Sequence, residues 1–279
     1  MSLFDTAMIV PLIITLAFAG ALIGFLAGVF GIGGGAISVP VFYQVFQQLG
    51  YSQDISMPMA VGTSLAIIIP TSINASRGHY KRGTMDMALL KIWLFPILAG
   101  VSIGAVVARD AGPQVFQLVF IAVAFINAAK LLFGGSGWRL CDSLPSRPVL
   151  SAYGGVIGLS SALMGIGGGA LSNLVMTLHG TPIIRAVSTS AGVGVLIAVP
   201  GTLGYMLAGW GHAGLPSYAL GFVWLAPLIL VVPASLMTTG FGVRLAHHLT
   251  KRQLETAFGF FLLLVSARFL YDFIGSTAR

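Results

Sequence analysis

The chain has 279 residues, of which 57% are hydrophobic and only 8% are charged, and its formal net charge is +7. Soluble domains usually carry about 25% charged residues, so this composition excludes an ordinary water-soluble globular protein. The positive charge is no nucleic-acid footprint either, because the basic residues sit in short loops between long apolar runs. The single cysteine, Cys141, leaves no internal disulfide and fits no metal cluster.

Apolar runs in the first part of the chain predict a broken segment followed by three membrane helices. A helix needs about 20 apolar residues to cross the hydrocarbon core of a bilayer. We expect a glycine-broken segment over residues 8–49, then helices at 57–76, 87–108 and 113–134. The apolar N-terminus does not predict a cleaved signal peptide, because Asp5 precedes it and no Lys or Arg does.

The second part of the chain repeats this order after a linker at residues 135–147. A second broken segment covers residues 148–180, and helices are expected at 182–208, 216–243 and 252–274. The pieces on either side of the second break are 17 and 11 residues long. At about 1.5 Å per residue, neither piece crosses a core of about 30 Å by itself.

Both broken segments carry the same motif. Gly24–Ser38 reads GFLAGVFGIGGGAIS and Gly158–Ser172 reads GLSSALMGIGGGALS, with 8 of the 15 positions identical. Further matches follow in the same order, such as WLFP from Trp93 with WLAP from Trp224. Collinear matches along the whole length predict an internal duplication.

The distribution of Lys and Arg predicts how the two repeats, residues 1–134 and 148–279, are oriented. If each broken segment folds back as a hairpin, eleven of the fourteen basic residues fall on one face, whereas a crossing segment gives nine and five. Basic residues favour the cytoplasmic face, so hairpins are predicted. Each half then crosses the membrane an odd number of times. We therefore expect an all-α integral membrane protein of two inverted repeats, each with a glycine-broken helical hairpin followed by three transmembrane helices. Both termini would then be periplasmic, on the face opposite the basic one.

The glycine motifs predict an anion site where the two repeats meet. Glycine leaves backbone N–H groups unshielded, and each helix after a break begins with an N-terminus that carries about half a positive charge. Two such ends at a shared cavity attract an anion. The predicted substrate-binding residues are Gly33, Gly34, Gly35, Ser38, Thr63, Ser64, Arg77, Gly167, Gly168, Gly169, Ser172, Asn173, Thr189 and Ser190.

These residues also have structural interpretations. Glycine clusters in membrane helices can be packing faces, Thr-Ser pairs can hydrogen-bond to the preceding helical turn, and Arg77 can cap a cytoplasmic helix end. His79 could join Arg77 in lining a cytoplasmic vestibule, and His179 could take part in proton coupling. All seven carboxylates lie at predicted ends or loops, which disfavours a cation carrier.

Taken together, these motifs make the chain resemble the TauE/SafE family of sulfite exporters. The resemblance rests on the paired motifs at Gly28–Ser38 and Ala162–Ser172, the AVGTS and AVSTS segments, and the turn from Tyr80 to Asp86. It covers about residues 8–274. The family implies a permease of the bacterial inner membrane that exports sulfite, sulfoacetate or related organosulfur anions. The second half lacks the basic turn, so the two halves are not equivalent in function.

We therefore expect a secondary transporter that exports a small sulfur-containing oxyanion by alternating access. The alternative is an anion channel, or a transporter of another small anion or metabolite. No Ser–His or paired-carboxylate constellation points to an enzyme, and we expect no catalytic residue, no cofactor and no metal. The expected partners are the anionic substrate and the lipid bilayer, without nucleic acid, and a homodimer is left open.

Overall fold

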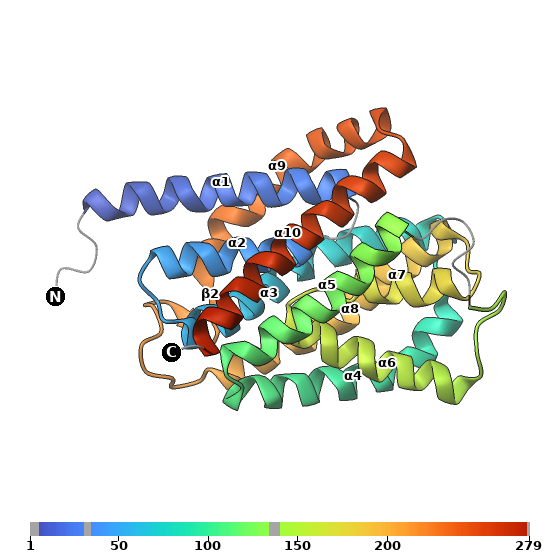
Figure 1. Cartoon of the computed structure of the whole chain (residues 1–279), viewed down its shortest axis with the longest axis horizontal. Helices are drawn as coiled ribbons and strands as arrows, with labels where there is room; N and C mark the ends of the chain where they lie inside the picture. Colours follow the sequence, from blue (N-terminus) through green and yellow to red (C-terminus); the bar gives the residue numbers. More distant parts are fainter. Residues whose placement is uncertain (1–5, 31–34, 134–139, 278–279) are drawn as a thin grey trace.

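The computed structural model describes residues 6–30, 35–133 and 140–277, and these residues are almost entirely helical (Figure 1). One two-stranded antiparallel hairpin interrupts the helices. The elements are α1 (Thr6–Phe30), α2 (Gly35–Gln48), α3 (Gln53–Lys81), α4 (Met87–Asp110), α5 (Pro113–Phe133), α6 (Arg147–Met164), α7 (Gly169–Leu178), α8 (Ile183–Ala208), β1 (Ala219–Leu220), β2 (Val223–Trp224), α9 (Leu225–His248) and α10 (Lys251–Thr277).

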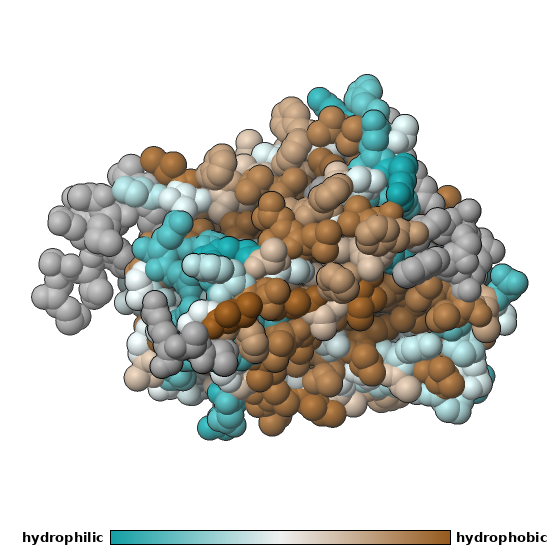
Figure 2. Space-filling model, in the orientation of Figure 1, coloured by the Kyte–Doolittle hydropathy of each residue, from teal (hydrophilic) through white to brown (hydrophobic). Residues whose placement is uncertain are grey.

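Among the described residues, six helices are long and apolar enough to cross a membrane, namely α3, α4, α5, α8, α9 and α10. They carry large hydrophobic side chains on the outside of the bundle, including Phe95, Leu207 and Met237, which are 76%, 73% and 75% exposed. Figure 2 shows hydrophobic surface across the middle of the molecule, with hydrophilic residues gathered toward its ends. Such an outer surface suits lipid, and the chain is a multi-pass membrane protein.

Helix α1 packs along α9 through a pair of glycines one turn apart. Gly20 and Gly24 face Val231 and Ser235, and a methyl group on Gly24 would lie 2.1 Å from the carbonyl oxygen of Ser235. Thr238 on α9 also donates a hydrogen bond of 2.8 Å to the backbone of α1. This small-xxx-small spacing lets two backbones approach closely, which is how membrane helices gain packing energy in lipid.

Helix α6 packs along α4 through glycines at the equivalent positions of the second repeat. Gly154 and Gly158 face Trp93 and Ile97, and a methyl group on Gly158 would lie 2.5 Å from the carbonyl oxygen of Ile97. The first helix of each half therefore packs on a helix of the other half, so the two halves are interlocked (Figure 1).

Equivalent helices of the two halves run antiparallel to each other. Ser188 near the start of α8 lies 3.0 Å from His79 near the end of α3. Arg252 at the start of α10 donates to the carbonyl groups of Leu131 and Leu132 at the end of α5. Inverted repeats require antiparallel equivalent helices. The inverted orientation of the two halves in a bilayer and the periplasmic location of both termini stay predictions.

Two element boundaries differ from those expected from the sequence. Helix α3 continues to Lys81, so Arg77 and His79 belong to the helix rather than to a loop. The helix expected from residue 216 begins at Leu225, because the preceding residues form the β-hairpin. Tyr218, with φ of 64°, turns the chain into that hairpin, and the apolar residues that follow it resemble the start of a membrane helix.

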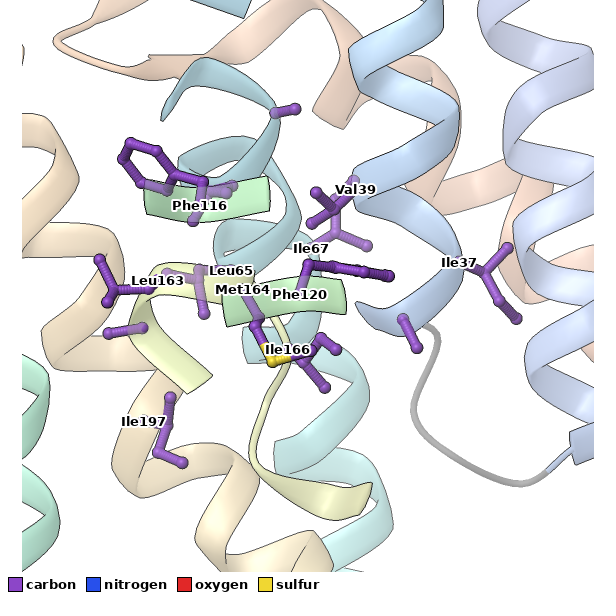
Figure 3. Close-up of a cluster of buried hydrophobic side chains, with 14 of the residues drawn as sticks. Ile37, Val39, Leu65, Ile67, Phe116, Phe120, Leu163, Met164, Ile166 and Ile197 are labelled. Carbon is purple, nitrogen blue, oxygen red and sulfur yellow. The ribbon is translucent and has the colours of Figure 1, made fainter. Parts of the chain in front are cut away.

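The second glycine break lies inside the main hydrophobic core. Ile166 is 5% exposed and belongs to the same buried cluster as Val39 of α2, Phe120 of α5 and Ile197 of α8 (Figure 3). The core therefore surrounds the break with side chains from both halves of the protein.

Candidate functional site: the junction of the two glycine motifs

The first residue of α2 and the second break meet in the interior. A methyl group on Gly35 would lie 2.9 Å from Ile166 Cα and 3.1 Å from the carbonyl oxygen of Gly165. Glycine at position 35 is thus what lets the two motifs touch. The preceding residues of the first motif, Gly33 and Gly34, lie outside the described residues.

Two serines connect this junction across the halves. Ser64 on α3 donates to the carbonyl oxygen of Gly165 at 2.7 Å. Ser38 on α2 lies 2.5 Å from Ser64, oxygen to oxygen. Because Ser64 has one proton and gives it to Gly165, Ser38 is the donor in this pair. Ser38, Ser64 and the break therefore form one buried hydrogen-bonded chain.

The second break turns the backbone with two glycines in the left-handed region. Gly165 ends α6 with φ of 66°, and Gly168 caps α7 with φ of 68°. Non-glycine residues are strained there. Ser172 donates back to the carbonyl oxygen of Gly168 at 2.7 Å, which ties the first turn of α7 to its cap.

The first N–H groups of α7 have no hydrogen-bond partner among the described residues. The first helical bond within this turn runs from the N–H of Ser172 to Gly168. No hydrogen bond between described residues uses the N–H of Gly169, Ala170 or Leu171. These three residues are half-buried, so their donors are open to an acceptor ligand or to water.

A second group points to the same place. Ser161 is 1% exposed, and its hydroxyl finds no hydrogen-bond partner in the described structure. Its oxygen would lie 3.3 Å from a methyl group on Gly168, so it borders the cap of α7. The sequence comparison missed Ser161, because the equivalent residue of the first repeat is Ala27. Asn173 follows Ser172 and has a buried side-chain oxygen that is likewise without a partner.

The Thr-Ser pairs play different parts in the two halves. Thr63 accepts a hydrogen bond from the N–H of Trp224 at 3.1 Å, and Ser64 reaches the break as described. Ser190 instead bonds within its own helix, to the carbonyl oxygen of Val187 at 2.8 Å. The back-bonding interpretation of these pairs thus holds for Ser190 and not for Ser64.

Thr189 and Arg77 lie away from the junction. Thr189 donates to the carbonyl oxygen of Arg185 and accepts from the N–H of Asp86, next to the turn between α3 and α4. Arg77 is exposed in the last turns of α3. His179 bonds to the carbonyl oxygen of Val175 at 2.9 Å, so it closes the end of α7.

The junction holds neither carboxylates nor a metal site. Helices α2, α6, α7 and α8 contain no Asp or Glu. In residues 6–30, 35–133 and 140–277, no group of His, Cys, Asp or Glu side chains could hold a metal ion. Backbone donors, hydroxyls and an amide in a place without negative charge suit a small anion.

Comparison with known proteins agrees with this architecture. The family model described as sulfite exporter TauE/SafE matches residues 16–269. A probable membrane transporter protein of Haemophilus influenzae is 29% identical over 248 residues, which is 88% of this chain and 94% of that protein. A probable membrane transporter protein of Methanocaldococcus jannaschii is 24% identical over 90% of this chain and 92% of its own length. The YunE protein of Bacillus subtilis, also a probable membrane transporter, is 25% identical over 94% of this chain and 99% of its own. No solved structure matches the chain.

Proposed function

Because the chain belongs to the sulfite exporter TauE/SafE family, we propose that it exports a small sulfur-containing oxyanion, such as sulfite or sulfoacetate, across the bacterial inner membrane. Family and relatives make it a membrane transporter rather than an enzyme. The choice of anion, the direction of transport and alternating access belong to the proposal.

The observation that carries the proposal is the group of unpaired donors at the start of α7. Within the part of the chain that the structure describes, the N–H groups of Gly169, Ala170 and Leu171 and the hydroxyl of Ser161 have no hydrogen-bond partner, and the Ser161 hydroxyl borders the cap at Gly168. A helix N-terminus attracts negative charge through its dipole and its free N–H groups. A tetrahedral or pyramidal oxyanion offers several acceptor oxygens to such donors.

Alternating access is supported by the arrangement of the halves. Substrate sites in transporters with inverted repeats lie near the midplane, at broken helices on the interface between repeats. Here Gly35 of one half meets Gly165 of the other, and Ser64 connects them. Rocking of one half against the other would change access to this junction from either side.

Export of an anion needs no coupling ion under ordinary conditions. A membrane potential of about 100 mV, inside negative, favours the exit of each negative charge by about 2.3 kcal/mol. The absence of carboxylates from α2, α6, α7 and α8 agrees with this uncoupled scheme.

The decisive experiment is efflux from proteoliposomes loaded with sulfite, sulfoacetate, taurine or sulfate. We expect saturable efflux of sulfite or a sulfonate, and Ser161→Ala should raise the KM or lower the maximal rate at least fivefold. This change breaks no hydrogen bond among the described residues, so the fold should tolerate it. Ser266→Ala on α10 is the matched control, because its buried hydroxyl is also unpartnered.

Three results would argue against the proposal. Flux that does not saturate would indicate the alternative, an anion channel. If none of the four anions leaves the proteoliposomes, the substrate is not one of these sulfur compounds and the proposal is wrong. If Ser161→Ala and Ser266→Ala have the same KM and maximal rate, the start of α7 is not the binding site.

A further inference from the structure

A pocket outside the central junction opens where the two halves meet at one end of the bundle. Its volume is about 320 Å³, which is within the usual size range for small-ligand sites. One wall is the turn between α3 and α4, and the other is the start of α8. The lining residues are Gly83, Thr84, Met85, Pro182, Ile184 and Arg185.

Arg185 is the charged side chain of this pocket, and Asp86 holds it in place. Arg185 Nη2 lies 2.9 Å from Asp86 Oδ2, while Asp86 Oδ1 accepts from the N–H of Leu89 and caps α4. The Asp86 side chain is only 14% exposed, whereas that of Arg185 is 56% exposed. A guanidinium has five donors in a rigid fork, so this contact leaves most of them facing outward.

A hydrogen-bonded network fixes the opposite wall. Ser188 on α8 donates to Thr84 at 2.8 Å and lies 3.0 Å from His79 Nδ1. Thr189 accepts from the N–H of Asp86 at 2.9 Å. Besides the ion pair, α8 is thus tied to the turn at Thr84 and Asp86 and to the end of α3 at His79, and this preorganises the pocket.

The surroundings of the pocket are strongly basic. The end of α3, the turn and the first part of α4 contain Arg77, Lys81, Arg82 and Lys91, and α8 adds Arg185. Asp86 is the acid among residues 77–91 and 182–185, which leaves four net positive charges. A field of this sign raises the local concentration of anions and speeds their capture.

We propose that this pocket is a peripheral binding site for the transported oxyanion, with Arg185 as its direct ligand and Asp86 as the residue that positions Arg185. A bidentate contact between a guanidinium and two oxygens of a sulfite or sulfonate group matches the chemistry of Arg with planar or tetrahedral oxyanions. The site receives the anion at one face before it reaches the start of α7. This inference rests on the proposed function for the identity of the anion.

The first test compares transport by Arg185→Ala, Arg185→Lys and Lys91→Ala in proteoliposomes. Lys91 loses the same charge but does not line the pocket. We expect Arg185→Ala to raise the KM about tenfold, with a maximal rate within twofold of wild type. The KM of Arg185→Lys should lie between those of wild type and Arg185→Ala. Lys91→Ala should change the KM less than threefold. Added KCl should raise the KM of the wild type by a larger factor than the KM of Arg185→Ala. Equal effects of Arg185→Ala and Lys91→Ala would overturn the proposal.

The second test detects the anion in the pocket without transport. Met85→Cys, made in a Cys141→Ser background, is labelled with N-ethylmaleimide in the full-length protein. Sulfoacetate is one probe, and sulfate replaces sulfite because sulfite consumes maleimides. We expect at least one of these anions to slow labelling threefold or more, chloride at equal ionic strength not to do so, and Arg185→Ala to abolish the protection.

These two tests separate this site from the proposed function. If an anion protects Met85→Cys but no tested anion is transported, the pocket proposal stands and the proposed substrate is wrong. If the wild type transports the anion, but Met85→Cys is not protected and Arg185→Ala has an unchanged KM, the pocket proposal is wrong and the proposed substrate stands. Thermal unfolding of Arg185→Ala within a few degrees of wild type shows that lost stability does not cause the effect.

Discussion

Ser64 on α3 donates a hydrogen bond of 2.7 Å to the carbonyl oxygen of Gly165, so a hydroxyl of the first half stabilises the glycine break of the second. Gly165 is the residue at which α6 ends, and its carbonyl oxygen is buried. A buried carbonyl without a donor costs about 1–3 kcal/mol. The bond therefore couples the positions of the halves to the conformation of the break.

Ser64→Ala should lower the free energy of unfolding by about 1–3 kcal/mol, because it removes the hydrogen bond from Ser64 to the Gly165 carbonyl oxygen. Ser190→Ala, at the equivalent position of the second half, removes only a bond within α8 and should cost at most about 1 kcal/mol. Thermal unfolding in detergent measures both. Equal losses would show that Ser64 does not connect the halves energetically.

Gly158→Ala should destabilise the protein by about 1–3 kcal/mol, because its methyl group would lie 2.5 Å from the Ile97 carbonyl oxygen and force α4 and α6 apart. Gly155→Ala is the control on the same helix, since its methyl group would meet the Pro96 carbonyl oxygen at 3.8 Å, an ordinary contact. That variant should unfold within about 1 kcal/mol of wild type. A tolerated Gly158→Ala would contradict the close packing of these helices.

Asp86→Asn and Asp86→Ala separate the two contacts of this side chain. Asn keeps an oxygen that caps α4 and loses the charge that pairs with Arg185, so it should cost about 1 kcal/mol or less. Ala loses the cap as well and should cost a further 0.5–2 kcal/mol, roughly. Unfolding by heat or denaturant gives both differences, and Asp86→Ala should be the less stable variant. The reverse order would mean that the hydrogen bond to the N–H of Leu89 contributes nothing.

The membrane orientation is tested by single cysteines in a Cys141→Ser background. Arg82→Cys at the end of α3 and Arg252→Cys at the start of α10 should react with an impermeant thiol reagent only from the cytoplasmic side. Arg109→Cys at the end of α4 should react from the periplasmic side. If the first two positions label from opposite faces, the inverted-repeat arrangement is excluded.

Much of the fold could be predicted because membrane helices are long apolar runs. The six longer helices overlap the predicted ones, although α9 begins nine residues later than expected, and the second break separates α6 from α7. The first break falls on residues outside the described ones, and the division into two repeats stays a prediction. The β-hairpin around Tyr218 was expected to be helical because most of its residues are apolar, although Pro216, Ser217 and Gly221 are residues typical of turns. The last turn of α3 was missed for the opposite reason: Arg77 to Lys81 are polar, yet the helical hydrogen bonds continue through them.

The role of the candidate site in substrate binding stays a prediction. Of the residues proposed for it, Gly35, Ser38 and Ser64 gather at Gly165 of the second motif, whereas Gly168 borders Ser161 instead. Ser161 was missed because a comparison of repeats finds only what both halves contain. The positions of Thr189 and Ser190 depend on which partners surround α8, and this information is in the packing rather than in the local sequence.

The interlocking of the halves also determines when α1 can pack against its partner helix during synthesis. Helix α1 leaves the ribosome first, but its packing partner α9 begins about 200 residues later. At about 5–20 residues per second, α1 is without its partner for roughly 10–40 s. During that interval the backbone of Gly20 and Gly24 faces lipid or the insertion machinery. The chain therefore completes its tertiary structure only after translation is nearly finished, and neither half can reach its native packing alone.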